Sequence, residues 1–76
     1  MVISFNVIYA NIGVCNYNCE KLRKVNPPAA HYFSSAERRF VDAAFALDRG
    51  DKTFCSLFLQ VSENLMNKAF EEISKR

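Results

Sequence analysis

The sequence predicts an α+β domain in which a short N-terminal β-hairpin packs on a C-terminal helical hairpin. The chain has 76 residues, of which 50% are hydrophobic and 24% are charged, and this composition fits one small globular domain rather than a disordered segment. Apolar side chains alternate near the amino terminus, whereas in the second half they recur every three or four residues. We therefore expect one domain over residues 1–76, with a β-ribbon at 1–18, a short helix and Pro-Pro loop at 19–33, and an αα-hairpin at 34–76.

The N-terminal strand is predicted from a period of two. Phe5, Val7 and Tyr9 fall on one face of an extended chain, and such alternation of aromatic and β-branched residues is typical of a half-buried strand. Gly13 suits a turn because glycine adopts positive φ freely, and residues 14–18 then complete the hairpin. One continuous buried helix over the same residues is the alternative interpretation.

The middle segment is predicted to hold a short helix followed by a loop. Asn18 is a suitable N-cap for a helix over residues 19–25. Pro27 is expected to end that helix, because the residue before a proline is pushed out of the α region. The aromatic pair Tyr32 and Phe33 then falls in a loop, which is an unusual place for such side chains.

The C-terminal half is predicted to form two antiparallel helices. Ser34 and Glu37 have the spacing of a capping box, which predicts a helix over about residues 35–48. Gly50 is the expected C-terminal stop of this helix, and Asp51 can cap the next one. The side chains expected on the buried stripe of the last helix are Phe54, Phe58, Val61, Leu65, Ala69 and Ile73.

The charge distribution leaves nucleic-acid binding as an alternative function. Ten Lys and Arg residues exceed eight Asp and Glu residues, so the formal charge is only +2, which does not by itself indicate a nucleic-acid ligand. Basic side chains interleaved with aromatic rings can nevertheless contact phosphates and stack on bases. A small dimeric regulator would use the basic residues of the middle region, which are Lys21, Arg23, Lys24, Arg38 and Arg39.

The sequence predicts neither a metal site nor catalysis. The spacing of Cys15 and Cys19 occurs in zinc sites, but His31 and Cys55 do not form a second local pair, so we expect free thiols and no metal. An odd number of cysteines argues against a secreted disulfide scaffold and favours the cytoplasm. No base accompanies a candidate nucleophile, no glycine-rich phosphate loop is present, and no apolar run is long enough for a membrane span. We therefore expect no enzyme activity, no cofactor and no membrane partner.

The aromatic content predicts a protein-binding function. Seven Phe and three Tyr give more apolar surface than a helical hairpin and a β-ribbon can cover, so we expect a homodimer or a protein partner. The leading hypothesis is a non-enzymatic interaction module that acts stoichiometrically as a regulator or inhibitor, of the kind that bacteria and phages encode. Aromatic and arginine side chains are favoured at such interfaces. The expected contact residues are Phe5, Val7, Tyr9, Tyr32, Phe33, Arg38 and Arg39.

Overall fold

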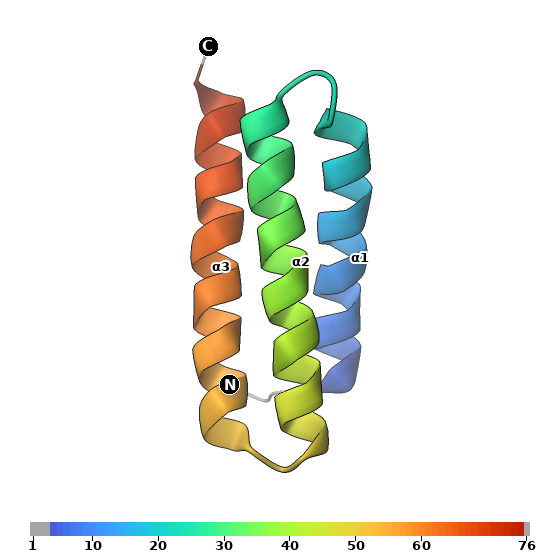
Figure 1. Ribbon diagram of the computed structural model, residues 1–76, viewed down its shortest axis with the longest axis vertical. Coiled ribbons are helices and arrows are strands. Elements are labelled where there is room, and N and C mark those ends of the chain that lie inside the picture. The colour runs from blue at the N-terminus through green and yellow to red at the C-terminus, as the bar shows by residue number, and fades with distance from the viewer. Residues whose placement is uncertain (1–3, 76) are drawn as a thin grey trace.

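The computed structural model describes residues 4–75 and folds this range into three helices without a strand. The helices are α1 (Phe5–Leu22), α2 (Pro27–Asp48) and α3 (Lys52–Ser74), and each runs antiparallel to the next (Figure 1). The expected α+β class with an N-terminal β-hairpin is therefore wrong, whereas the helical hairpin expected in the second half is confirmed.

Helix α1 replaces the predicted β-ribbon because its buried side chains follow a helical period. Ile8 and Cys15 are fully buried seven residues apart, which is two helical turns. Ser4 caps the helix through its Oγ, which accepts the Val7 N–H at 3.3 Å. Apolar residues on several sides of α1 also produce the alternation that suggested a strand. Residues 1–3 of the expected ribbon lie outside the described residues.

Gly13 does not make the expected turn, because it lies within α1. The Asn11 side chain donates to the Val7 carbonyl at 2.9 Å, one helical turn back. Gly13 has a negative φ and meets no other atom within 4 Å of where a Cβ would lie, so it is accommodated on an exposed part of α1. The helix-destabilising effect of one glycine, about 1 kcal/mol, is smaller than the gain from packing the buried side of α1.

The expected helix at 19–25 and the Pro-Pro loop are also wrong. Helix α1 continues to Leu22, and the two prolines occupy the first positions of α2 instead of ending a helix. Proline fits there because its missing N–H has no intrahelical partner at a helix start. Asn26 caps α2 by accepting the Ala29 N–H at 3.2 Å, and its Nδ2 donates to the Glu72 carbonyl at 3.3 Å. This single side chain therefore ties the α1–α2 turn to the end of α3.

The capping box predicted at Ser34 and Glu37 is wrong, because both residues lie inside α2. Glu37 instead accepts a hydrogen bond from the side chain of Asn16 at 3.4 Å, which joins α2 to α1. The predicted end of the helix is confirmed, since α2 stops at Asp48 and Gly50 adopts a φ of 78°. The expected cap of α3 is confirmed too, since the Asp51 carboxylate accepts the Phe54 N–H at 3.1 Å.

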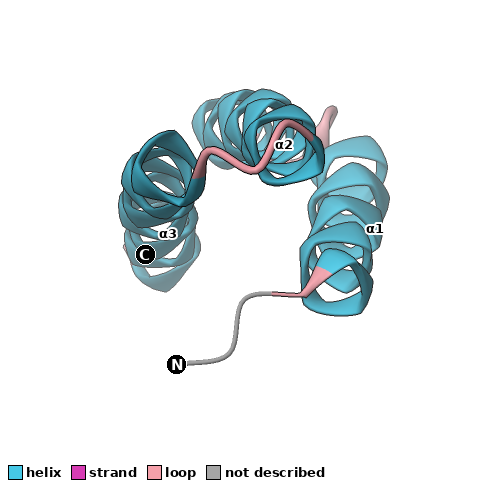
Figure 2. Ribbon diagram, turned by 90° about the horizontal axis from the view of Figure 1, so that it is seen from below, coloured by secondary structure: helices cyan, strands magenta, loops and turns pink. Residues whose placement is uncertain are grey.

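Helix α2 is the centre of the fold. Figure 2 shows the three helices as an open arc in which α2 packs against both neighbours, while α1 and α3 have at most slight contact with each other. The largest buried side chains of α2 are those of Phe33 and Phe40, which are at most 2% exposed. Small side chains beside them let the neighbouring helices approach closely. The buried alanines of α2 are Ala29, Ala30, Ala36, Ala43 and Ala46.

Helix α3 buries a stripe that only partly matches the predicted one. Of the predicted residues, Ala69 is fully buried and Phe58, Leu65 and Ile73 pack against the core, whereas Phe54 and Val61 are exposed. Its fully buried residues are Cys55, Ser62 and Ala69, which repeat every seven residues, whereas Val61 is 44% exposed. Ala69 belongs to both stripes, so α3 is rotated by less than the angle of one residue, about 100°, from the orientation that hydrophobicity alone suggests. Small side chains on this stripe match the alanines of α2. The hydroxyl of buried Ser62 is satisfied within the helix, since it donates to the Phe58 carbonyl at 2.7 Å.

Candidate functional site

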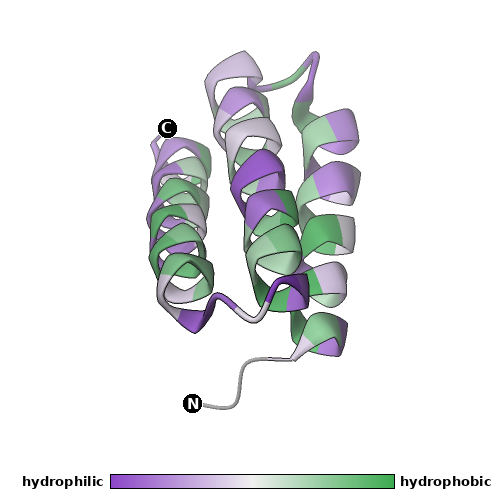
Figure 3. Ribbon diagram, turned by 60° about the horizontal axis from the view of Figure 1, so that its bottom comes forward, coloured by the Kyte–Doolittle hydropathy of each residue, from purple (hydrophilic) through white to green (hydrophobic). Residues whose placement is uncertain are grey.

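The open arrangement leaves much apolar surface exposed. The accessible surface is 5231 Å² for a chain of 8.7 kDa, whereas a compact monomer of that mass exposes about 4,700 Å². Figure 3 shows apolar, green segments on all three helices. The exposed aromatic residues are Phe5, Tyr9, Tyr17, Phe45, Phe54 and Phe70.

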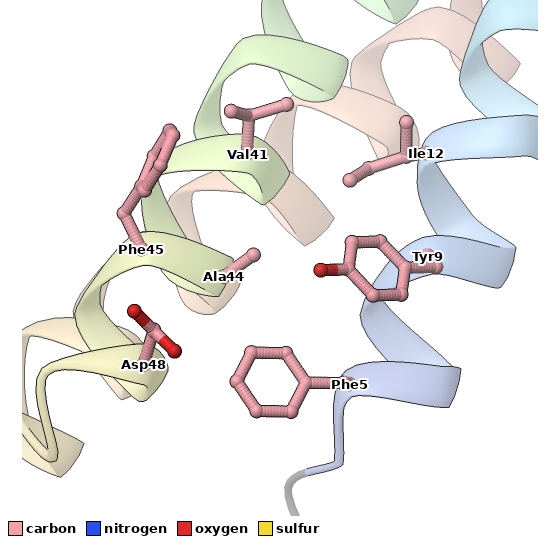
Figure 4. A pocket seen from close by; sticks show the side chains of 7 residues that line it. All are labelled: Phe5, Tyr9, Ile12, Val41, Ala44, Phe45 and Asp48. Carbon is pink, nitrogen blue, oxygen red and sulfur yellow. The ribbon is translucent and has the colours of Figure 1, made fainter.

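One groove gathers three of these rings. It lies between the first half of α1 and the second half of α2 and has a volume of about 330 Å³. Figure 4 shows its two walls, with the Phe5 and Tyr9 rings extending from α1 toward α2. The lining residues are Phe5, Tyr9, Ile12, Val41, Ala44, Phe45 and Asp48. We call this surface the α1–α2 groove.

Helical spacing explains why these side chains lie together. Phe5, Tyr9 and Ile12 are spaced by four and three residues, so they project from one side of α1. The rings of Phe5 and Tyr9 stack at 6.0 Å between centroids with an interplanar angle of 22°. On the opposite wall Ala44 is small, and Figure 4 shows open space between it and the two rings. The groove is thus hollow at Ala44, because its small side chain does not fill the space in front of the two rings.

Among the described residues that line the α1–α2 groove, Asp48 alone is charged. Among residues 4–75, no basic side chain lies within 4 Å of its carboxylate, and the ion pairs found in this range involve Glu20, Asp42 and Glu72. Residues 1–19 carry no charged side chain, so the α1 wall is uncharged. The groove therefore presents an apolar surface with one exposed negative charge at its end.

The structure separates the contact residues expected near the amino terminus. Phe5 and Tyr9 line the α1–α2 groove, but Val7 is rotated by about 200° from each of them along α1. Val7 is 53% exposed on another side of the helix. Three residues that share one face of a strand thus belong to two sides of a helix.

The remaining expected contact residues lie elsewhere on α2. Phe33 is fully buried and its ring meets that of Phe70 edge-on, with 5.4 Å between centroids. Tyr32 is half-buried. Arg38 is exposed, whereas Arg39 forms an ion pair with Asp42 at 3.1 Å. None of the expected residues Tyr32, Phe33, Arg38 and Arg39 lines the α1–α2 groove.

Sequence reasoning missed the α2 wall of the groove. This wall begins at Val41 and continues three, four and seven residues later with Ala44, Phe45 and Asp48. Residues at these spacings share one side of a helix, so the spacing could have identified them as one stripe. The rotation of α2 against α1, which depends on tertiary packing, makes this stripe a wall rather than core.

The basic residues of the alternative function do not form one patch. Lys21, Arg23 and Lys24 lie at the end of α1 and in the following turn, whereas Arg38 is eleven residues along α2 from Pro27, about 16 Å by helical rise. Arg23 is paired with Glu20 at 2.6 Å.

Cys15 and Cys55 lie in environments that disfavour the reactive and metal-binding form of a thiol. Burial, followed by the charges of Glu37 and Cys19, raises the pKa of the Cys15 thiol to about 11. Burial also raises the pKa of Cys55. A raised pKa lowers the fraction of thiolate, which is the nucleophilic and metal-binding form. His31 is exposed on α2, and within residues 4–75 no three His, Cys, Asp or Glu side chains are grouped to hold a metal ion.

The same described residues contain no helix with the length and apolarity required to cross a bilayer. Comparison with known proteins finds no matching protein family, no matching curated protein and no matching solved structure.

Proposed function

We propose that this protein is a non-enzymatic interaction module that binds another protein stoichiometrically and regulates or inhibits it through the α1–α2 groove. The observation that carries the proposal is the stacked pair of Phe5 and Tyr9, which faces Ala44 across a hollow in a groove that Phe45 also lines. Aromatic side chains in a pocket are the usual anchors of protein interfaces. Phe45 is 60% exposed, so covering its ring alone would contribute about 1–2 kcal/mol to association.

The proposed setting is the cytoplasm. All three cysteines are free, and two of them are fully buried, so the fold has no need of an oxidising compartment.

A comparative pull-down tests the proposed function. Tagged wild-type protein and the variants Tyr9→Ser and Phe45→Ser are incubated with lysate of the source organism, and bound proteins are quantified by mass spectrometry. Tyr17→Ser is the matched control, because Tyr17 is 65% exposed on α1 outside the groove. We expect a partner that the wild type and the control retain equally, and that each groove variant retains about tenfold less well.

Equal capture by all four proteins would contradict the proposed function. Circular dichroism of each variant verifies that the helices persist, and because the replaced rings are more than half exposed we expect them to persist. The solution mass by light scattering identifies a second copy as the occupant if groove variants convert a dimer to a monomer.

The nucleic-acid alternative predicts a different pattern. Binding to phosphates would weaken steeply between about 0.05 and 0.5 M salt and would be lost when Arg38 and Arg39 are replaced by Ala. Binding through the aromatic groove should change little over the same range, and the double variant should retain the partner. No observation on the described residues favours the nucleic-acid function, because its basic side chains are dispersed.

A further inference from the structure

The shape of the α1–α2 groove suits a helix as its occupant. The groove runs between two antiparallel helices, and its α1 wall extends from Phe5 to Ile12, about 10 Å or two helical turns. Helices pack along such grooves with anchors spaced by three, four and seven residues. An extended peptide could not add to a sheet edge, because residues 4–75 contain no strand.

The chemistry of the α1–α2 groove suits a basic side chain beside the apolar anchors. The lining is apolar except for the Tyr9 hydroxyl and the Asp48 carboxylate. Lys and Arg have long apolar stems with a charged end. A stem along the Phe5 ring would bring its charge to Asp48, and the same charge would also interact favourably with the aromatic faces.

Asp48 also discriminates against other helices. A covering helix removes water from this exposed carboxylate, and the loss of hydration is offset only where the helix supplies a positive charge or a hydrogen-bond donor. An entirely apolar helix would bury the carboxylate unpaired, and an acidic helix would add repulsion.

From these observations we propose that the α1–α2 groove binds an amphipathic helix of a partner protein that carries a Lys or Arg side chain paired with Asp48. The inference rests on the proposed protein-binding function and specifies the chemistry of the partner at the same groove. Charge complementarity selects this occupant, because the groove has a negative charge without a basic partner among residues 4–75.

A pair of charge substitutions tests the inference. The probes are fluorescein-labelled stapled peptides of about 14 residues, with three Leu anchors at helical spacing and a Lys one turn before or after them. Matched peptides carry Glu or norleucine in place of Lys. Fluorescence anisotropy at low ionic strength measures binding to the wild type, to Asp48→Asn and to Asp48→Lys. Glu63→Lys is the control, because Glu63 is exposed on α3 outside the groove and its replacement changes the net charge equally.

We expect the wild type to bind a Lys peptide about fivefold to tenfold more tightly than the matched Glu peptide. Asp48→Asn should remove most of this preference, Asp48→Lys should reverse it, and Glu63→Lys should preserve it. The inference is overturned if no peptide binds, if Lys and Glu peptides bind equally, or if the preference survives in Asp48→Lys.

The pull-down separates failure of this inference from failure of the proposed function. A partner that Phe45→Ser loses but Asp48→Lys retains would leave the groove as a protein-binding surface and exclude the basic side chain. A partner that both variants lose, while Glu63→Lys retains it, agrees with the peptide result.

Discussion

Placing a carboxylate at position 62, and in a separate variant at position 61, tests which stripe of α3 faces α2. Ser62 is fully buried, so Ser62→Asp would bury a charge without a partner and cost about 4 kcal/mol. Val61 is 44% exposed, so Val61→Asp loses only part of a side chain's apolar burial, about 1 kcal/mol. A domain of 76 residues has a total stability of about 4–11 kcal/mol. Ser62→Asp should therefore remove between about a third and all of the folding free energy.

The assay is urea unfolding followed by circular dichroism at the helical band. With a slope of about 1 kcal/mol per molar urea, Val61→Asp should lower the midpoint by about 1 M and Ser62→Asp by several molar. Ser62→Ala is the control, because its hydroxyl bonds only within the helix, and its midpoint should stay within about 1 M of the wild type. If Val61→Asp proves as costly as Ser62→Asp, the orientation of α3 described above is wrong.

Three further outcomes follow from burial, thiol chemistry and capping. Phe33→Ala should lower the free energy of unfolding by about 3–5 kcal/mol in urea titrations, whereas Phe45→Ala should cost less than about 1 kcal/mol; equal losses would contradict their difference in burial. Because the pKa of Cys15 is raised in the folded protein, its neutral thiol stabilises the fold fully below about pH 9, and this contribution is lost as the pH rises toward 11. The wild type should therefore lose about 2 kcal/mol more than Cys15→Ala across that range, and parallel pH profiles would refute the assignment. Asn26→Ala removes the cap of α2 and the bond to Glu72, so thermal unfolding should show a loss of about 1–2 kcal/mol, and an unchanged melting temperature would exclude both contributions.

The elements that sequence reasoning predicted correctly depend on short-range signals. Gly50 ends α2 because only a residue that tolerates a φ of 78° fits after the last turn. Asp51 starts α3 because its carboxylate reaches an N–H three residues away. Each signal involves a few neighbouring atoms, so it can be recognised without knowledge of the rest of the fold.

The errors arose where two local interpretations have similar free energies. Asn26 and Pro27 suit the end of one helix and the beginning of another equally well, and the described structure uses them for the beginning. Alternating apolar residues near Tyr9 fit a strand, but the spacing from Ile8 to Cys15 fits a helix as well. Packing against α2 decided between the two, since an isolated ribbon has unpaired edges whereas a helix satisfies its own backbone.

The sequence by itself determined the helical hairpin with its turn at Gly50 and the excess of aromatic side chains. Tertiary structure decided the helical state of α1, the rotation of α3 that buries Ser62, and the meeting of Phe5 and Tyr9 with Asp48 in one groove. The physical reason is that a helix with apolar side chains on several sides can bury any of them. The stripe that becomes buried is the one that best fits the neighbouring helix, and the stripes left outside form the surface available to a partner.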